Sequence, residues 1–478
     1  MRSMTGSVAQ STAGAIETDP NLDAIVSVLP DLARWPRLVG WAGPSAEARA
    51  FREQLGLPID RPVVMTGHQA QVWHPGILAK YLAADAYAER EGAACAWVWV
   101  DQDAHAPVLV RYPVRVNGGG EDQALSVRVW NAGGGGGGED VPTARMPAFA
   151  PGALPVLNSG ERFAAPGVER GLVEIHGALG RHVGAGSAAA QLAGAMREML
   201  APLVRAPGVD VLSLAISRTS LFAEVVERMR SDAGACIRTY REAVAAHPRE
   251  RVAILGEDEL PLWRIGREHG SPRRRVSVAE LRDGRVAPSE LAPKALLMTG
   301  LLRMAGCELF IHGTGGGGRA GHEGYDRITE DWLRAWLGVG LAPMAVVTAT
   351  MHLRIGLAGP GIRELRRRQW LAHRARHDPS LLNDAAAADR KREFTARVRE
   401  AMDTPAGAVG VYKEMHRFLA DYRARHADEI RRLDEAADHA TARARDAEIA
   451  HDRSWAFPLY EADQISALRE RFTDLRRG

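Results

Sequence analysis

Polar side chains that can exchange protons or bind small molecules gather where the first strongly apolar run of the chain ends. The group consists of Thr66, Gly67, His68, Gln69, His74 and Lys80. An imidazole with a pKa of about 6.5 can accept or donate a proton near neutrality, so His68 is a candidate base or hydrogen-bond donor. Pro75, at the start of the next helix, favours a bound phosphate or carboxylate, because helix N-termini carry unpaired N–H groups. The alternative is an ordinary turn whose polar side chains cap the helix.

A second group of acidic and polar side chains follows the next apolar run. It comprises Asp101, Gln102 and Asp103, with His105 close behind. Two carboxylates at a strand end can hold an ammonium group, a sugar hydroxyl or a metal ion, and spacing does not choose among them. Ligands bind outside the carboxyl ends of parallel strands, so we expect this group to face the first one. Asp and Gln are also common where strands turn into loops.

A third group surrounds a glycine run in the second half of the chain. His312 and Gly313 precede glycines 315–318 and a predicted helix that carries Tyr325 and Arg327. Successive backbone N–H groups can enclose an anion, with the tyrosine and the arginine closing the site. In the alternative, the glycines form only a flexible loop.

Arg218 is the last candidate, after the apolar run 209–216. An arginine that points into a strand-end crevice could clamp a carboxylate or a phosphate. The alternative is a simple helix start, with Thr219 or Ser220 as the N-cap.

These groups must be positioned by strands and helices that alternate along the chain. Helical spacing of apolar residues follows the first strand run, which is the pattern of a βαβ unit. We therefore predict an α/β fold with an open, doubly wound, Rossmann-like parallel sheet over residues 61–350, interrupted by an insertion at about 113–207. The apolar runs that predict strands are 62–66, 96–100, 209–216, 252–255, 295–299, 308–311 and 344–348.

Two further regions flank this core. Residues 1–60 suggest a leader and short capping helices, and residues 351–478 are charged, rich in alanine and helical. From Met415 to Ala447, apolar residues step by three and four with an interruption at His426, which predicts a coiled-coil or helix-hairpin seam and thus a helical arm. Such an arm favours a homodimer through the C-terminal helices.

Composition limits the possible partners of this 478-residue chain. A net charge of +2 gives no electrostatic reason to expect nucleic acid or an anionic membrane as the main partner. The arginines at 273–275 and 366–368 are expected to be solvated. Cys95, Cys236 and Cys307 are few and far apart, which favours a reducing cytoplasm over a disulfide framework. Neither a signal peptide nor a membrane-spanning run is evident.

Several well-known catalytic and binding motifs are absent from the sequence. It contains no HExxH, GxSxG or Walker A motif, and no GxGxxG follows the first strand run. We accordingly expect no metal site, and the partner should be a small molecule.

The segment from Thr66 to Ala70, Thr-Gly-His-Gln-Ala, with Lys80 on the following helix, resembles the Thr-Gly-Gln-Gln-Ala opening of the bacillithiol-synthesis cysteine-adding enzyme (BshC) family. Asp101 to Asp103 lies where that family has Glu-Asp-His-Asp. Gly313 to Gly316 and Tyr325 are similar to its glycine loop and tyrosine-bearing helix. His68 departs from the family pattern, and so does an apparent insertion at 319–324.

The resemblance implies a Rossmann-like core, a helical dimerisation arm and a ligase or transferase that joins cysteine to the amine of glucosaminyl malate. On this hypothesis, His68, Asp101 and Asp103 are catalytic and the other candidates bind substrate. A nucleotide-binding or nucleotidyl-transfer enzyme similar in layout to class I synthetases is a second hypothesis, with ATP or ADP as candidate cofactors. A non-catalytic coiled-coil assembly protein is the third.

Overall fold

The computed structural model describes residues 24–117, 123–132, 140–154, 160–205, 208–318, 324–356, 362–401 and 405–474. The predicted leader, the glycine runs at 118–120 and 133–138, and most of the apparent insertion at 319–324 lie outside these ranges.

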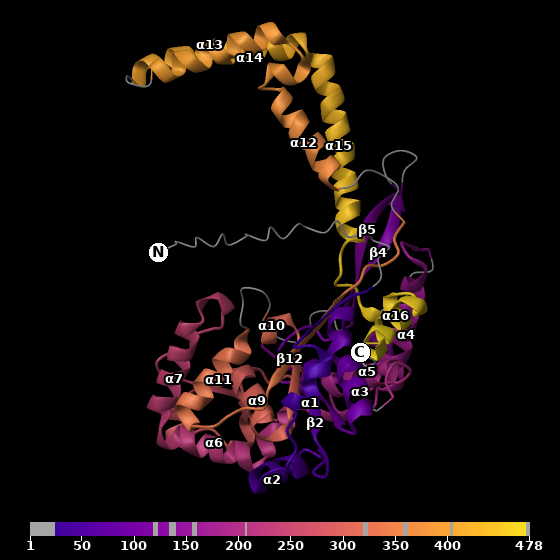
Figure 1. Cartoon of the computed structure of the whole chain (residues 1–478), viewed down its shortest axis with the longest axis vertical. Helices are drawn as coiled ribbons and strands as arrows, with labels where there is room; N and C mark the ends of the chain where they lie inside the picture. The colour runs from indigo at the N-terminus through magenta and orange to yellow at the C-terminus, as the bar shows by residue number, and fades with distance from the viewer. Residues whose placement is uncertain are drawn as a thin grey trace, which may run out of the picture.

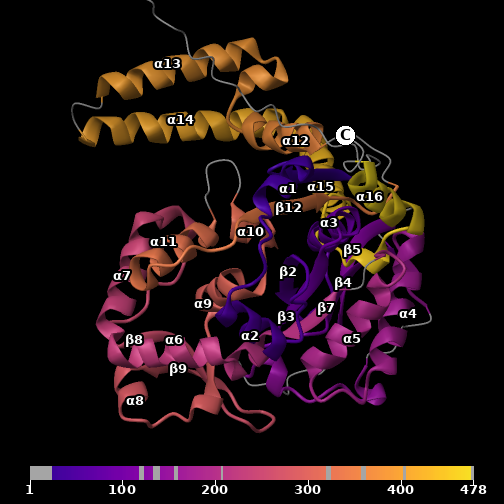
Figure 2. The same cartoon turned by 60° about the horizontal axis from the view of Figure 1, so that its bottom comes forward.

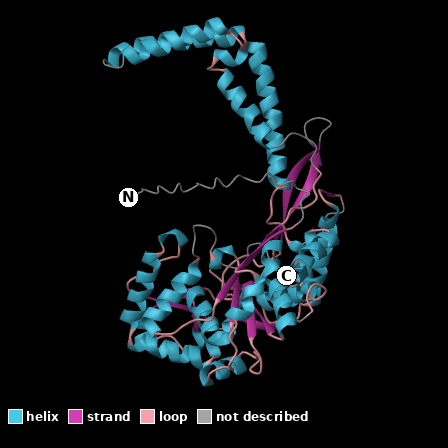
Figure 3. Ribbon diagram, in the orientation of Figure 1, coloured by secondary structure: helices cyan, strands magenta, loops and turns pink. Residues whose placement is uncertain are grey.

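A six-stranded sheet in the order β1-β12-β11-β2-β3-β7 forms the centre of the protein (Figures 1 and 3). Neighbouring strands from β12 to β7 pair in parallel, and β1 joins the edge antiparallel to β12. The predicted α/β fold with a mostly parallel central sheet is therefore confirmed. The strands are β1 (Ile25–Leu29), β2 (Val63–Gln69), β3 (Ala94–Val100), β7 (Val209–Leu212), β11 (Leu309–His312) and β12 (Met344–Thr350).

Helices cover both faces of this sheet. Along β2, Val64 belongs to one hydrophobic cluster, whereas Val63 and Met65 belong to another, because successive side chains of a strand point to opposite faces. The first cluster includes α3 (Pro75–Glu91), α4 (Pro166–Arg181) and α5 (Ala188–Leu200). The second cluster includes α2 (Ala46–Gln54), α6 (Ser220–Ser231), α7 (Ala233–Ala246), α9 (Ala295–Leu301) and α11 (Tyr325–Leu337), and Figure 2 shows the two sets of helices on either side of the sheet.

Two short sheets accompany the central one. β4 (Leu109–Asn117) pairs with β5 (Gln123–Asn131) and β6 (Arg162–Phe163), within or next to the predicted insertion. β8 (Glu259–Ile265) pairs with β9 (Arg273–Ser277) and β10 (Leu291–Pro293). The remaining short helices near the core are α1 (Trp35–Leu38), α8 (Val278–Arg282) and α10 (Thr314–Gly317).

Several predicted elements need correction. Residues 295–299 form most of α9 instead of a strand, because Ala, Leu and Met favour helix and a short apolar run does not distinguish the two states. Residues 252–255 are irregular, and the Ile254 side chain is 60% exposed. β7 ends at Leu212 and a 3₁₀ helix, Ser213–Arg218, follows. The N-terminal region contributes strand β1 as well as helices.

The C-terminal region consists of helices, as expected. They are α12 (Ile362–Ala375), α13 (Ala385–Ala401), α14 (Pro405–Arg425) and α15 (Ala427–Ala450). The break between α14 and α15 falls at His426, where the apolar spacing is interrupted. α12 packs beside α15 and α13 packs beside α14, in a projection that extends away from the central sheet (Figures 1 and 2).

After this projection the chain returns to the body of the protein. The 3₁₀ helix Phe457–Leu459 packs on α4, and α16 (Ala462–Asp474) packs on α3. Leu459, Leu468 and Phe472 belong to the same hydrophobic cluster as one face of the central sheet. The division of the chain into domains stays a prediction, but part of the predicted helical domain is packed into the core. Within the described residues, no helix has the length and apolar character needed to cross a membrane.

Candidate functional site

A pocket of about 380 Å³ lies at the carboxyl ends of β2 and β11. Counted in chain order, the parallel strands stand across the sheet as 3-2-1-4-5, and β2 and β11 are the first and fourth of them. The order of strands reverses between these two, which is where open parallel sheets bind ligands. The predicted site residues that line the pocket are Gly67, His68, Gln69, His74, Lys80, Asp103, His312, Gly313 and Tyr325.

Asp101 does not line this pocket, which corrects the expectation that both aspartates face His68. Its Oδ1 atom accepts hydrogen bonds from Ser213 Oγ and from the Leu214 amide, each at 2.8 Å. Burial raises the pKa of the Asp101 carboxyl to about 6. Asp101 therefore fastens the 3₁₀ helix after β7 to the end of β3, and its position supports a structural role.

Two other predicted site residues, Thr66 and Gln102, form hydrogen bonds within the protein. The Thr66 hydroxyl donates to the carbonyl of Ile311 at 2.9 Å, which joins β2 to β11. The Gln102 side-chain amide donates to the carbonyl of Pro293 at 2.5 Å. Both residues are buried beside the pocket without lining it.

The two arginines that were predicted to be site residues, Arg218 and Arg327, lie outside the pocket lining. Arg218 is exposed, and the Thr219 hydroxyl next to it accepts from the Phe222 amide and caps α6. Arg327 is exposed on α11, and its guanidinium lies 2.8 Å from Glu330. Neither arginine lines the pocket.

The start of α3 also differs from expectation. His74 Nδ1 accepts a hydrogen bond from the Gly76 amide at 3.1 Å, and the His74 carbonyl accepts from the amides of Ile77 and Leu78. Pro75 has no N–H group to offer. The first amides of α3 are thus satisfied within the protein, which corrects the expected phosphate or carboxylate site at this helix end.

The half-buried side chain of His68 lines the pocket. Its ring meets Trp73 edge-on, with 6.2 Å between ring centroids. Burial, followed by the charge of Lys80, holds the pKa of His68 well below its usual value, so the imidazole is neutral at neutral pH. In the described part of the chain, the buried Nδ1 atom has no hydrogen-bond partner.

Asp103 is the carboxylate that faces the pocket. Its Oδ2 atom accepts from the Gln69 amide at 3.3 Å, so the ends of β2 and β3 do meet as predicted. Its Oδ1 atom lies 2.9 Å from Arg273 Nη1, and the Arg273 guanidinium stacks over Trp263 at 4.5 Å. Arg273 is thus not simply solvated as expected, because the fold of β8 and β9 carries it to the rim of the site.

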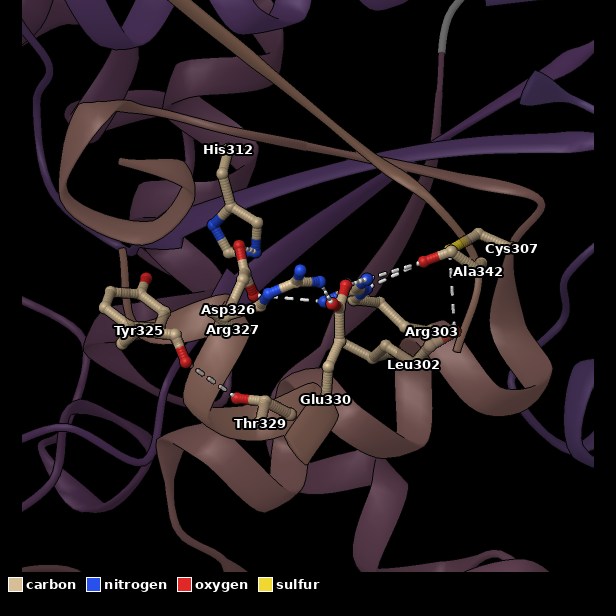
Figure 4. A network of polar contacts seen from close by, with 10 residues as sticks. All are labelled: Leu302, Arg303, Cys307, His312, Tyr325, Asp326, Arg327, Thr329, Glu330 and Ala342. Carbon is tan, nitrogen blue, oxygen red and sulfur yellow. Dashed lines mark hydrogen bonds and ion pairs between the residues drawn. The ribbon is translucent and has the colours of Figure 1, made fainter. Parts of the chain in front are cut away.

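His312 is held from behind by a charged network in Figure 4 that sequence reasoning missed. Its Nε2 atom lies 3.1 Å from Asp326 Oδ2, and Asp326 Oδ1 lies 3.5 Å from Arg303 Nη1. Arg303 also pairs with Glu330. The Tyr325 ring stands at 87° to His312, with 5.7 Å between centroids. In the sequence, the one indication of this network is that Asp326 directly follows Tyr325, which is itself a predicted site residue.

Glycine allows the backbone to approach closely at two points of the pocket wall. A Cβ atom at Gly67 would lie 2.7 Å from Val98 Cβ and 2.8 Å from the Val98 carbonyl oxygen. A Cβ atom at Gly316 would lie 2.3 Å from His312 Nδ1. Side chains at either position would displace β3 or the imidazole, so both glycines shape the pocket.

No protein-family model and no curated protein matches this sequence. Among the described residues, no three His, Cys, Asp or Glu side chains cluster in a way that could hold a metal ion. The pocket instead combines a carboxylate, a lysine, imidazoles and a phenol. These groups can bind an ammonium or hydroxyl compound and transfer protons.

Proposed function

We propose that this protein is an enzyme of Rossmann-like, doubly wound architecture that joins an amino-acid carboxyl group to the amine of a small acceptor. The main support is the pocket itself. It lies where the strand order reverses, and side chains from β2, α3, β11 and α11, with Asp103 just after β3, line it together. Placement of the reacting groups would provide most of the catalysis.

In this proposal, Asp103 binds the ammonium or a hydroxyl group of the acceptor. Its carboxylate faces the pocket and is held at both oxygens, so it is already oriented for a ligand. Gln69, His312 and Tyr325 add hydrogen-bonding groups around it. Because burial disfavours the protonated form of His68, this residue is a weak base, and its neutral imidazole is better suited to a hydrogen-bonding role in the pocket.

The resemblance to the bacillithiol-synthesis cysteine-adding family suggests cysteine as the acid and an amino-sugar derivative as the acceptor. Formation of an amide bond also requires an activated acyl group, such as an acyl phosphate or adenylate. ATP is therefore a candidate cofactor that would supply the phosphoryl or adenylyl group, and ADP is the product that remains after phosphoryl transfer. A nucleotide-binding enzyme remains the second candidate, since ligands with phosphate groups often bind at this edge of such sheets. The satisfied amides at the start of α3 count against a phosphate at that helix end.

The helical projection supports a further part of the proposal, a coiled-coil arm through which two copies associate. Trp370 on α12 is 54% exposed, and Val409 and Tyr412 on α14 are also exposed. In the non-catalytic alternative, the protein functions in assembly through this arm and not through the pocket. The separation of Asp101 from His68 counts in favour of that alternative, whereas the convergence of His68, Asp103 and His312 on one pocket counts against it.

A thermal-shift screen tests the proposed function. L-cysteine, glucosamine, ATP, ADP and divalent metal salts are added separately to the full chain. A ligand at a hundredfold excess over its Kd stabilises the folded state by about 2.7 kcal/mol. The proposal expects cysteine or glucosamine to raise the melting temperature of the wild type and the Arg327→Gln control, but not of His68→Ala or Asp103→Asn.

Each other result of this screen has a defined meaning. Stabilisation by ATP or ADP alone would favour the nucleotide-binding alternative. No stabilisation by any of these compounds would contradict the ligase proposal and favour the assembly protein. Equal shifts in wild type and both pocket variants would show that the ligand binds elsewhere.

A further inference from the structure

Lys80 is buried in the wall of the pocket without an opposite charge. Only 3% of the residue is exposed, and its Nζ atom donates a hydrogen bond to the Gly67 carbonyl at 2.6 Å. Within the described residues, Lys80 forms no ion pair with a carboxylate. The nearby side chains of His68 and Tyr81 bring no negative charge, since burial disfavours ionisation of the tyrosine.

Lys294 shows what a buried lysine usually requires. Its ammonium group pairs with Glu259 and lies 4.7 Å from the centre of the Trp263 ring. The carboxylate offsets part of the loss of hydration, although burial still lowers the pKa of Lys294 below its usual value. Lys80 has only one carbonyl dipole in place of that carboxylate. Lys80 therefore loses a proton and becomes a neutral amine much more easily than an ordinary lysine does.

A neutral amine in a binding pocket has a lone pair that can take up a proton. Burial lowers the pKa of Lys80 from 10.5 to about 7. A general base works best when its pKa lies near the working pH, and Lys80 meets this condition, whereas the pKa of His68 is held well below 6.5. The Gly67 carbonyl, already in hydrogen-bond contact, can then stabilise the ammonium group that forms.

We propose that Lys80 is the proton acceptor of this site and acts on a substrate that carries a primary ammonium group. This inference rests on the proposed function and specifies its base. One N–H bond of the substrate ammonium breaks, a new N–H bond forms at Nζ, and the substrate nitrogen keeps the electron pair. The free amine then attacks the acyl carbon of an acyl phosphate or acyl adenylate and forms the C–N bond. The phosphate or AMP leaves with the electrons of the C–O bond, and the departing phosphate group takes the second proton from the nitrogen.

The small number of lysines permits a direct test. Lys80, Lys294, Lys391 and Lys413 are the only lysines in the chain, so lysine labelled with ¹³C at Cε gives few signals. Each signal is assigned by a Lys→Arg variant and followed by NMR as a function of pH. The inference expects Lys80 to titrate near pH 7 and Lys294, with its Glu259 partner, to titrate higher. A midpoint of Lys80 above roughly pH 9 would overturn the inference, whatever the ligand screen shows.

Glucosamine then serves as the ammonium probe. A bound ammonium group beside Nζ should lower the midpoint of Lys80 further, because like charges disfavour protonation. If glucosamine binds but leaves the midpoint unchanged or raises it, the amine does not face Lys80 and the inference fails. If Lys80 titrates near pH 7 but neither glucosamine nor cysteine binds, the proposed function is contradicted. The inference that Lys80 can lose its proton near pH 7 is then still upheld.

Turnover provides the last test. With a working assay, Lys80→Ala should lose about 10²- to 10⁴-fold in kcat, and added methylamine should restore part of it. Lys80→Arg keeps the charge but cannot lose its proton, so it should stay inactive. Full activity of Lys80→Arg, or failure of methylamine to rescue a folded Lys80→Ala variant, would contradict a proton-acceptor role.

Discussion

His312 Nε2 lies 3.1 Å from Oδ2 of Asp326, a side chain with no exposed surface. The same carboxylate lies 3.5 Å from Arg303, which in turn pairs with Glu330 (Figure 4). These contacts join the end of β11 to α11 and to the short π-helix Leu302–Gly306, which follows α9. The Asp326 and Arg303 side chains are fully buried, and the Asp326 carboxylate lies beside the imidazole at the edge of the pocket.

Loss of the Asp326 charge should destabilise the fold. In Asp326→Asn, Arg303 keeps Glu330 and its hydrogen bonds to the Ala342 carbonyl but loses one of its two carboxylate partners, and His312 loses the neighbouring carboxylate charge. Breaking a buried ion pair in this way costs about 3 kcal/mol in the free energy of unfolding. Urea denaturation measures the change. Arg327→Gln on the same helix is the control, since its guanidinium is largely exposed and its pair with Glu330 should contribute less than about 1 kcal/mol. Equal effects of the two variants would contradict the importance of the buried network.

Asp101 should make stability depend on pH. Burial raises its pKa from 3.8 to about 6, so ionisation disfavours the folded state. Below about pH 4 the carboxyl is protonated in both states and the cost vanishes, whereas above about pH 6 the full cost applies. Asp101→Asn keeps the Oδ1 acceptor without the charge. The stability of the variant relative to wild type should rise by up to about 3 kcal/mol from pH 4 to pH 7. Urea denaturation measures the difference in stability between the variant and the wild type across this pH range. A difference that stayed constant would contradict the prediction.

Helix α4 offers a matched pair of glycines for testing the returning C-terminal segment. A Cβ atom at Gly171 would lie 2.2 Å from the Pro458 carbonyl oxygen, while one at Gly180 would meet nothing within 4 Å. Gly171→Ala should therefore destabilise the protein by about 1 to 3 kcal/mol through overpacking. Gly180→Ala should be neutral or stabilising by up to about 1 kcal/mol, because alanine favours helix. Thermal and urea unfolding would show the contrast, and similar effects at both positions would argue against this packing.

The exposed indole of Trp370 should be part of a contact between two copies of the arm. Aromatic side chains of this size often dominate such contacts. If the arm dimerises as proposed, Trp370→Glu should shift the protein toward monomer in sedimentation velocity measured at micromolar concentration. Arg368→Glu changes an exposed charge on another face of the same helix and should leave the dimer intact. A wild-type protein that remains monomeric throughout would exclude this role of the arm.

The sequence alone located the main features of the site because they are local. Each apolar run that became β2, β3 or β11 is followed at once by polar residues, and parallel strands bring those ends to one edge. His68, Asp103 and His312 could therefore be predicted to converge. The interruption of apolar spacing at His426 likewise located the break between two long helices.

Tertiary structure decided which of these side chains are available to a ligand. Asp101 and Asp103 are chemically alike and two residues apart, yet contacts with Ser213 and Leu214, more than a hundred residues away, bury the first. Distant strands likewise brought Arg273 to Asp103, and helix packing placed Arg303 behind Asp326. Local patterns carry no record of such partners, because burial and pairing depend on segments that meet only in the folded chain. For the same reason, the shortage of counter-charge around Lys80 became visible only in three dimensions.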